Sequence, residues 1–160
     1  MNGVRDPLEG LPFVDEHRVL VAADAGRVWR TLAEVVGRKR GGGSEAYARL
    51  VCAEPATASG PPLELGSTLP GMRVVESVPG RRAVLAGRHF LSRYTLTVVL
   101  EPEPDGPGTV LAAGTYAVFP GPLGFAYRLL VIESGAHEKA VRALLERVRE
   151  RAERAERPSD

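Results

Sequence analysis

This 160-residue chain has a single cysteine, no long apolar run and almost no excess of either charge. Cys52 is the only cysteine, so an intrachain disulfide and a zinc site built from thiolates are both excluded. The low cysteine content favours a reducing compartment, and we expect a cytoplasmic location. No run approaches the roughly 18 apolar residues of a membrane-spanning helix, so no membrane span is predicted. Charged residues interrupt the first part of the chain, so a signal peptide is not expected.

The charges nearly cancel. Lysine and arginine total 21 and aspartate and glutamate total 20, which leaves a net charge of +1. This balance gives no electrostatic reason to expect nucleic acid or an anionic membrane as a partner. The basic, glycine-rich residues 38–43 lack the residue order of a phosphate-binding loop, so a solvated loop is predicted there. Ser134 lies outside any nucleophile-elbow motif, which leaves nucleophilic catalysis without support.

Length and composition fit one domain with a sizeable core. Apolar residues make up 44% of the chain, close to the average of globular proteins. We therefore expect a single domain over residues 1–160, with its core at about residues 14–154 and flexible termini.

The first third of the chain predicts a strand, a tight turn and a helix. Residues 13–23 end in an apolar run that is typical of a strand, and Asp24 is placed to cap a helix that ends at Gly37. Residues 45–53 fit either a short helix or a strand, with a slight preference for the helix. Residues 55–70 are rich in proline and glycine, which predicts a loop or an edge region.

The rest of the chain predicts an antiparallel meander followed by a long helix. The expected strands are residues 72–78, 82–90, 93–101 and 109–119, and their short connections require antiparallel neighbours. Residues 123 to about 157 predict the helix, with an interruption at Gly135. One face of this helix is apolar, with the stripe His137, Val141, Leu144, Leu145, Val148 and Ala152.

The apolar face of the sheet and the apolar stripe of the helix must cover each other. A strongly curved sheet around one helix leaves a space at its mouth, and such a space is usually a ligand cavity. The sequence therefore predicts an internal pocket between the sheet and the terminal helix.

Three stretches make this chain similar to a known superfamily. VLVAADAGRVW at residues 19–29 resembles its first strand and following helix, GSTLPGMRV at residues 66–74 resembles its approach to the central strands, and FPG at residues 119–121 precedes its terminal helix. These stretches resemble the START/Bet v 1-like helix-grip superfamily, which includes the polyketide cyclase-like (SRPBCC) proteins. The resemblance implies an α+β helix-grip fold, in which a curved antiparallel β-sheet wraps around a long C-terminal α-helix, with one or two short helices after the first strand. It also implies a cavity for a hydrophobic ligand.

Alternation along the strands predicts which side chains point into this cavity. The inward set of the three central strands is Met72, Val74, Glu76, Val78, Ala83, Leu85, Gly87, His89, Tyr94, Leu96, Val98 and Leu100. With the helices and the last strand included, the predicted ligand-binding residues are Trp29, Val74, Glu76, Leu85, His89, Tyr94, Leu96, Tyr116, His137 and Val141.

His89, Tyr94 and His137 are the candidate catalytic residues, because histidine and tyrosine exchange protons when held beside a substrate. The commoner role for such histidines is a core position with local hydrogen bonds. In the same way, the commoner role for a residue such as Trp29 is packing of the helix, and the commoner position for Glu76 is the solvated end of a strand. A metal site would need Glu76 as a third ligand at a spacing that the chain lacks, so no metal and no cofactor are expected.

Three functions stay open. The first is binding of a small hydrophobic molecule that is lipid-, polyketide- or aromatic-like. The second is a polyketide cyclase-, aromatase- or dehydratase-like enzyme that uses His89, Tyr94, Tyr116 or His137 as acid and base. The third is an interaction module, or a homodimer without a ligand, formed through the last helix or a sheet edge.

Overall fold

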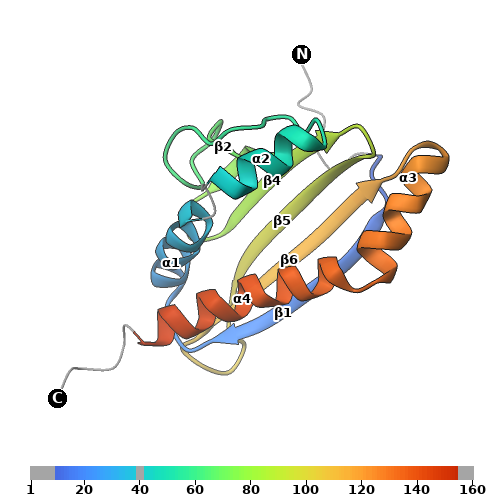
Figure 1. The fold of residues 1–160 in the computed structure, drawn as a ribbon. Helices are drawn as coiled ribbons and strands as arrows, with labels where there is room; N and C mark the ends of the chain where they lie inside the picture. The colour runs from blue at the N-terminus through green and yellow to red at the C-terminus, as the bar shows by residue number, and fades with distance from the viewer. Residues whose placement is uncertain (1–9, 39–41, 155–160) are drawn as a thin grey trace, which may run out of the picture.

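A six-stranded antiparallel sheet with helices packed on one face forms the protein in a computed structural model, which describes residues 10–38 and 42–154. The strand order is β1-β6-β5-β4-β3-β2. The long helix α4 (Ala136–Arg154) lies across this sheet, as Figure 1 shows, so the predicted α+β arrangement is confirmed. The strands are β1 (Phe13–Val21), β2 (Thr68–Leu69), β3 (Met72–Val78), β4 (Arg82–His89), β5 (Ser92–Pro102) and β6 (Thr109–Val118). The shorter helical segments are α1 (Ala25–Arg38), α2 (Gly42–Leu50), α3 (Gly121–Arg128) and the π-helical turn η1 (Leu129–Glu133).

Two parts of the sequence prediction fall on residues that are not described. The flexible termini concern residues 1–9 and 155–160, and the solvated loop includes residues 39–41. The expectation for the termini lies outside the described residues, as does the loop at residues 39–41. The rest of the predicted loop was wrong, because Arg38 ends α1 and Gly42 begins α2. The ambiguous segment 45–53 is helical as far as Leu50, where α2 ends.

Helix α1 begins where predicted and ends one residue later. The backbone N–H of Arg27 donates to Asp24 Oδ1 at 3.0 Å, and this hydrogen bond lowers the pKa of Asp24. Gly37 does not end the helix, which continues to Arg38. Instead, the absence of a side chain at Gly37 lets Pro62 lie close to the helix, because a Cβ at Gly37 would lie 2.9 Å from Cγ of Pro62.

The interruption predicted at Gly135 is confirmed. Gly135 has a φ of +75°, which L side chains rarely adopt, and it separates the turn η1 from the start of α4. The C-terminal helical region is therefore divided, with α3 and η1 on one side of the glycine and α4 on the other (Figure 1). None of the helices in the described residues is long and apolar enough to cross a membrane.

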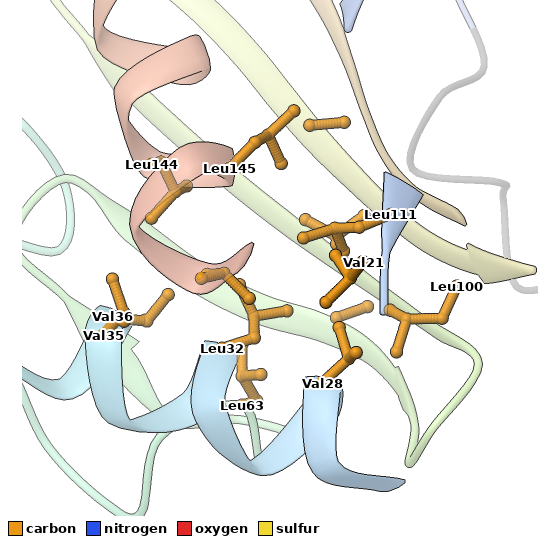
Figure 2. Close-up of a cluster of buried hydrophobic side chains, with 14 of the residues drawn as sticks. Val21, Val28, Leu32, Val35, Val36, Leu63, Leu100, Leu111, Leu144 and Leu145 are labelled. Atoms are coloured by element: carbon orange, nitrogen blue, oxygen red, sulfur yellow. The ribbon is translucent and has the colours of Figure 1, made fainter. Parts of the chain in front are cut away.

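The core lies between the sheet and the two long helices. Leu32 of α1 and Leu145 of α4 pack towards Val21 and Leu111 of the sheet, and Figure 2 shows these side chains converging. All four are almost fully buried. Each buried leucine or valine contributes about 1.5–3 kcal/mol, so this cluster holds the helices to the sheet.

Two β-bulges interrupt the side-chain alternation, and the one in β3 corrects orientations predicted from the sequence. The first lies between Val74 and Glu76 in β3. After it, Ser77 points inward and donates to the Leu63 carbonyl at 2.6 Å, whereas Glu76 lies on the outer face with its carboxylate 3.3 Å from Arg82 Nε. The inward orientation predicted for Glu76 and Val78 was wrong, because one extra residue in a strand turns every later side chain to the opposite face.

The second bulge lies between Phe13 and Asp15 in β1. It places Asp15 opposite Thr115 on the inner face and Phe13 opposite Tyr116 on the outer face. The rings of Phe13 and Tyr116 meet edge to face there, with their centroids 5.6 Å apart. The position predicted for Tyr116, beside the pocket, was wrong for a reason other than this bulge, because β6 is regular and both of its faces are rich in apolar residues. Its strand neighbours Thr115 and Ala117 point inward instead.

A buried hydroxyl on the outer face of β5 predicts a stabilising substitution. Thr97 is buried, and its Oγ1 has no hydrogen-bond partner among the described residues. An unsatisfied buried hydroxyl costs free energy that an apolar group of similar shape does not, so Thr97→Val is expected to raise the free energy of unfolding by about 1 kcal/mol. Urea unfolding of the two proteins measures this change, and a clear loss of stability in the variant would contradict it.

Candidate functional site

A cavity of about 640 Å³ lies between the inner face of the sheet and the helices. This volume is within the range of roughly 300–1,000 Å³ that is usual for small-molecule sites. Helices α2 and α4 and the segment α3–η1 contribute side chains to it, together with strands β4, β5 and β6. Most of the lining is apolar, and includes Leu32, Val36, Leu63, Leu85, Leu96, Val98, Val131, Ile132, Val141 and Leu144.

The lining carries no lysine, arginine, aspartate or glutamate among the described residues. Its polar side chains are hydroxyl-bearing residues and the histidines His89 and His137. Burial of a charged group without an opposite charge is strongly unfavourable. The cavity is therefore suited to an uncharged ligand.

His89 lies at the hairpin end of β4, and both of its ring nitrogens have protein partners. The backbone N–H of Leu91 donates to Nδ1 at 3.1 Å, so Nδ1 is unprotonated and the ring proton is on Nε2. Nε2 then donates to Ser92 Oγ at 3.1 Å. Burial lowers the pKa of His89, which agrees with a neutral ring. Its ring also meets that of Tyr127 edge to face, with the centroids 4.9 Å apart.

Tyr94 is tied to the loop before β3. Its hydroxyl donates to the Gly71 carbonyl at 2.6 Å, and burial, with a smaller effect of Tyr47, raises its pKa to about 12. Gly87, opposite Tyr94 in β4, makes room for this contact, because a Cβ there would lie 1.9 Å from the Gly71 carbonyl oxygen. The hydroxyl is therefore held as a neutral donor to the backbone.

Two further tyrosines lie beside the cavity on helices α2 and α3. The hydroxyls of Tyr47 and Tyr127 are 3.5 Å apart, and burial raises the pKa of Tyr127. Neither residue was predicted, because α2 and α3 are short helices without a clear apolar stripe in the sequence.

His137, at the start of α4, belongs to a second polar group. Its Nε2 lies 3.0 Å from Thr115 Oγ1 and 3.5 Å from Asp15 Oδ1. The other carboxylate oxygen of Asp15 lies 3.2 Å from His17 Nε2. Sequence reasoning missed Asp15, His17 and Thr115. The alternation of β1 is the signal that could have found the first two, since both point inward with Val19 and Val21.

Six of the ten residues predicted to bind the ligand line the cavity, and four do not. Trp29 of α1 packs against the core, Val74 is buried in the core cluster, and Glu76 and Tyr116 lie on the outer face. The six that line it are Leu85, His89, Tyr94, Leu96, His137 and Val141. Within the described ranges, no group of three or more histidine, cysteine, aspartate or glutamate side chains is placed to hold a metal ion.

Solved structures share this fold at low sequence identity, whereas no family model and no curated protein sequence matches the chain. Protein MLL2253 from Mesorhizobium loti is similar over 89% of this chain and 98% of its own, with a TM-score of 0.56 and 13% identity. The Aha1 dimer from Colwellia psychrerythraea is similar over 86% and 94%, with a TM-score of 0.54 and 13% identity. CalU16 from Micromonospora echinospora is similar over 88% and 83%, with a TM-score of 0.50 and 17% identity. At these identities the likeness shows a common fold.

Proposed function

We propose that this chain binds a small, uncharged hydrophobic molecule that is lipid-, polyketide- or aromatic-like. The observation that carries the proposal is the cavity of about 640 Å³ with a mostly apolar lining. We also assign the chain to the START/Bet v 1-like superfamily, on the three sequence stretches described above together with the sheet-and-helix arrangement.

Binding accounts for the polar side chains of the cavity better than acid–base catalysis does. A general base needs a free lone pair within reach of the substrate proton. Both nitrogens of His89 are engaged by Leu91 and Ser92, and the hydroxyl proton of Tyr94 is donated to the backbone. The hydrogen bonds of these two candidate catalytic residues therefore hold the pocket in shape, which leaves His137 as the remaining one of the three catalytic candidates.

The test compares two fluorescent probes that share the same rings. N-Phenyl-1-naphthylamine is uncharged, and 8-anilinonaphthalene-1-sulfonate is the same molecule with a sulfonate. We expect the uncharged probe to bind one site with saturable enhancement of its emission, and the sulfonate to bind at least about tenfold more weakly, because no cation in the lining offsets its charge.

Protein unfolded in urea serves as the control and is expected to enhance neither probe in a saturable manner. Equal affinities for the two probes would contradict the uncharged character of the pocket. Absence of saturable binding by N-phenyl-1-naphthylamine would contradict the proposed function itself.

A further inference from the structure

We propose that Thr115, oriented by His137 and Asp15, donates a hydrogen bond to a carbonyl oxygen of the bound molecule. This inference rests on the proposed function and deepens it, because it names the polar group that the hydrophobic ligand carries. The ligand class is an uncharged molecule with a ketone, ester or amide oxygen.

Three elements bring the polar group together at the cavity wall. Thr115 points inward from β6 and lies opposite Leu96 of β5, in the middle of the apolar lining. Asp15 of β1 points to the same face, in alternation with His17 and Val19, and lies directly opposite Thr115. Helix α4 begins after Gly135, and this start places His137 over both residues.

The position of each proton follows from the partners. Asp15 Oδ1 faces His137 Nε2 at 3.5 Å without a hydrogen bond between them, and the negative charge of the carboxylate favours the tautomer with the ring proton on that nitrogen. In the other tautomer, the lone pair of Nε2 would face the carboxylate. In this tautomer Nε2 donates its proton to Thr115 Oγ1 at 3.0 Å, where the threonine oxygen is the acceptor.

Because Thr115 Oγ1 accepts from His137, the hydroxyl proton of Thr115 is available to donate to a different acceptor. Among the described residues, Thr115 has no side-chain hydrogen bond other than the one with His137, and both side chains line the cavity. A donor in an apolar cavity is stabilised when a bound molecule supplies an acceptor. A carbonyl oxygen of an uncharged ligand fits this requirement, because it accepts and does not donate.

His17 holds the carboxylate from the other side. Its Nε2 lies 3.2 Å from Asp15 Oδ2, whereas Oδ1 of Asp15 is buried and turned towards His137. The carboxylate is thus held by a hydrogen bond at Oδ2, whereas Oδ1 has no hydrogen-bond partner among the described residues and only faces His137 Nε2. Asp15 and His137 are positioning residues in this account, and Thr115 is the group that contacts the ligand.

The test uses 2-acetylnaphthalene and 2-isopropenylnaphthalene, which have nearly the same shape and differ by a carbonyl oxygen in place of a methylene. Each probe displaces N-phenyl-1-naphthylamine, and the displacement gives its Kd. In Thr115→Val we expect the ketone to bind about five- to tenfold more weakly and the alkene to change by less than about twofold, because one hydrogen bond is lost.

Matched variants separate this role from a structural one. Thr115→Ser retains the hydroxyl and is expected to keep the preference for the ketone. Thr97→Val removes a threonine hydroxyl from the outer face of the same sheet and is expected to change neither Kd. His137→Phe is expected to lower the ratio of ketone to alkene affinity, and His137→Gln to restore it, because the side-chain amide donates from a position close to that of Nε2.

The outcomes distinguish this inference from the function on which it rests. If Thr115→Val weakened binding of the ketone and the alkene equally, so that the ratio of their affinities stayed the same, the carbonyl subsite would be overturned. Binding of the uncharged fluorescent probe would still support the proposed function in that case. Failure of 2-acetylnaphthalene to displace that probe from the unmodified protein would overturn the subsite as well. Failure of all the uncharged probes to bind would overturn both.

Discussion

Leu145→Ala is expected to lower the free energy of unfolding by about 3 kcal/mol, which is a large part of the stability of a domain this size. Leu145 is 2% exposed and lies in the core between α4 and the sheet (Figure 2). Its truncation removes apolar contacts and leaves a void that the surrounding side chains fill only in part. Urea unfolding followed by circular dichroism measures the effect as a shift of the midpoint at constant m value.

Leu130→Ala is the matched control for this measurement. Leu130 is also a helical leucine, in η1, but it is 69% exposed. Its truncation is expected to change the free energy of unfolding by less than about 0.5 kcal/mol. Similar effects of the two substitutions would mean that α4 does not hold the sheet as described.

Ala117→Trp is expected to weaken binding of N-phenyl-1-naphthylamine at least about tenfold without lowering the unfolding temperature. Ala117 lies in β6 opposite Tyr94, and its methyl group faces the cavity. An indole at this position occupies space that a ligand would need. Because the space is already open, the larger side chain fills a void rather than overpacking a dense core.

Ala143→Trp adds the same indole at an exposed position of α4 and serves as the control. It is expected to leave the Kd of the probe unchanged. Loss of near-ultraviolet circular dichroism in Ala117→Trp would indicate that the indole has no room. In that case, or if the affinity of Ala117→Trp equalled that of the unaltered protein, the cavity would not be the binding site.

The regular strands explain why much of the architecture was predictable from the sequence. In β4 and β5 the alternation is unbroken, so Leu85, His89, Tyr94 and Leu96 point to the inner face as the pattern indicates. The C-terminal helix was predictable for a similar reason, since its apolar stripe repeats at the helical period and Gly135 interrupts it.

The bulge in β3 explains one part of what was not predictable. A bulge adds one residue to one strand, and no residue type in residues 13–15 or 74–76 marks its position. The alternation therefore gave the wrong face for Glu76. In β6 both faces are rich in apolar residues, so the pattern contained too little contrast to orient Tyr116.

The polar group around His137 could not be predicted from the sequence for a different reason. His137 was predicted to point inward, but its partners come from β1 and β6, which are far away in the sequence. Only the pairing of β1 with β6 brings Asp15 next to Thr115. Alternation along β1 can indicate the face of Asp15, but a hydrogen-bonding group that depends on strand pairing cannot be located from local sequence patterns alone.

The central claim is that the hollow between the sheet and α4 receives the ligand. Intermolecular nuclear Overhauser effects between N-phenyl-1-naphthylamine and the methyl groups of the protein test it most directly. Contacts are expected with Leu85, Leu96 and Val141, whose side chains face the cavity from the two sides. Contacts confined to exposed methyl groups such as those of Leu123 and Leu130, with none from the cavity wall, would contradict the account.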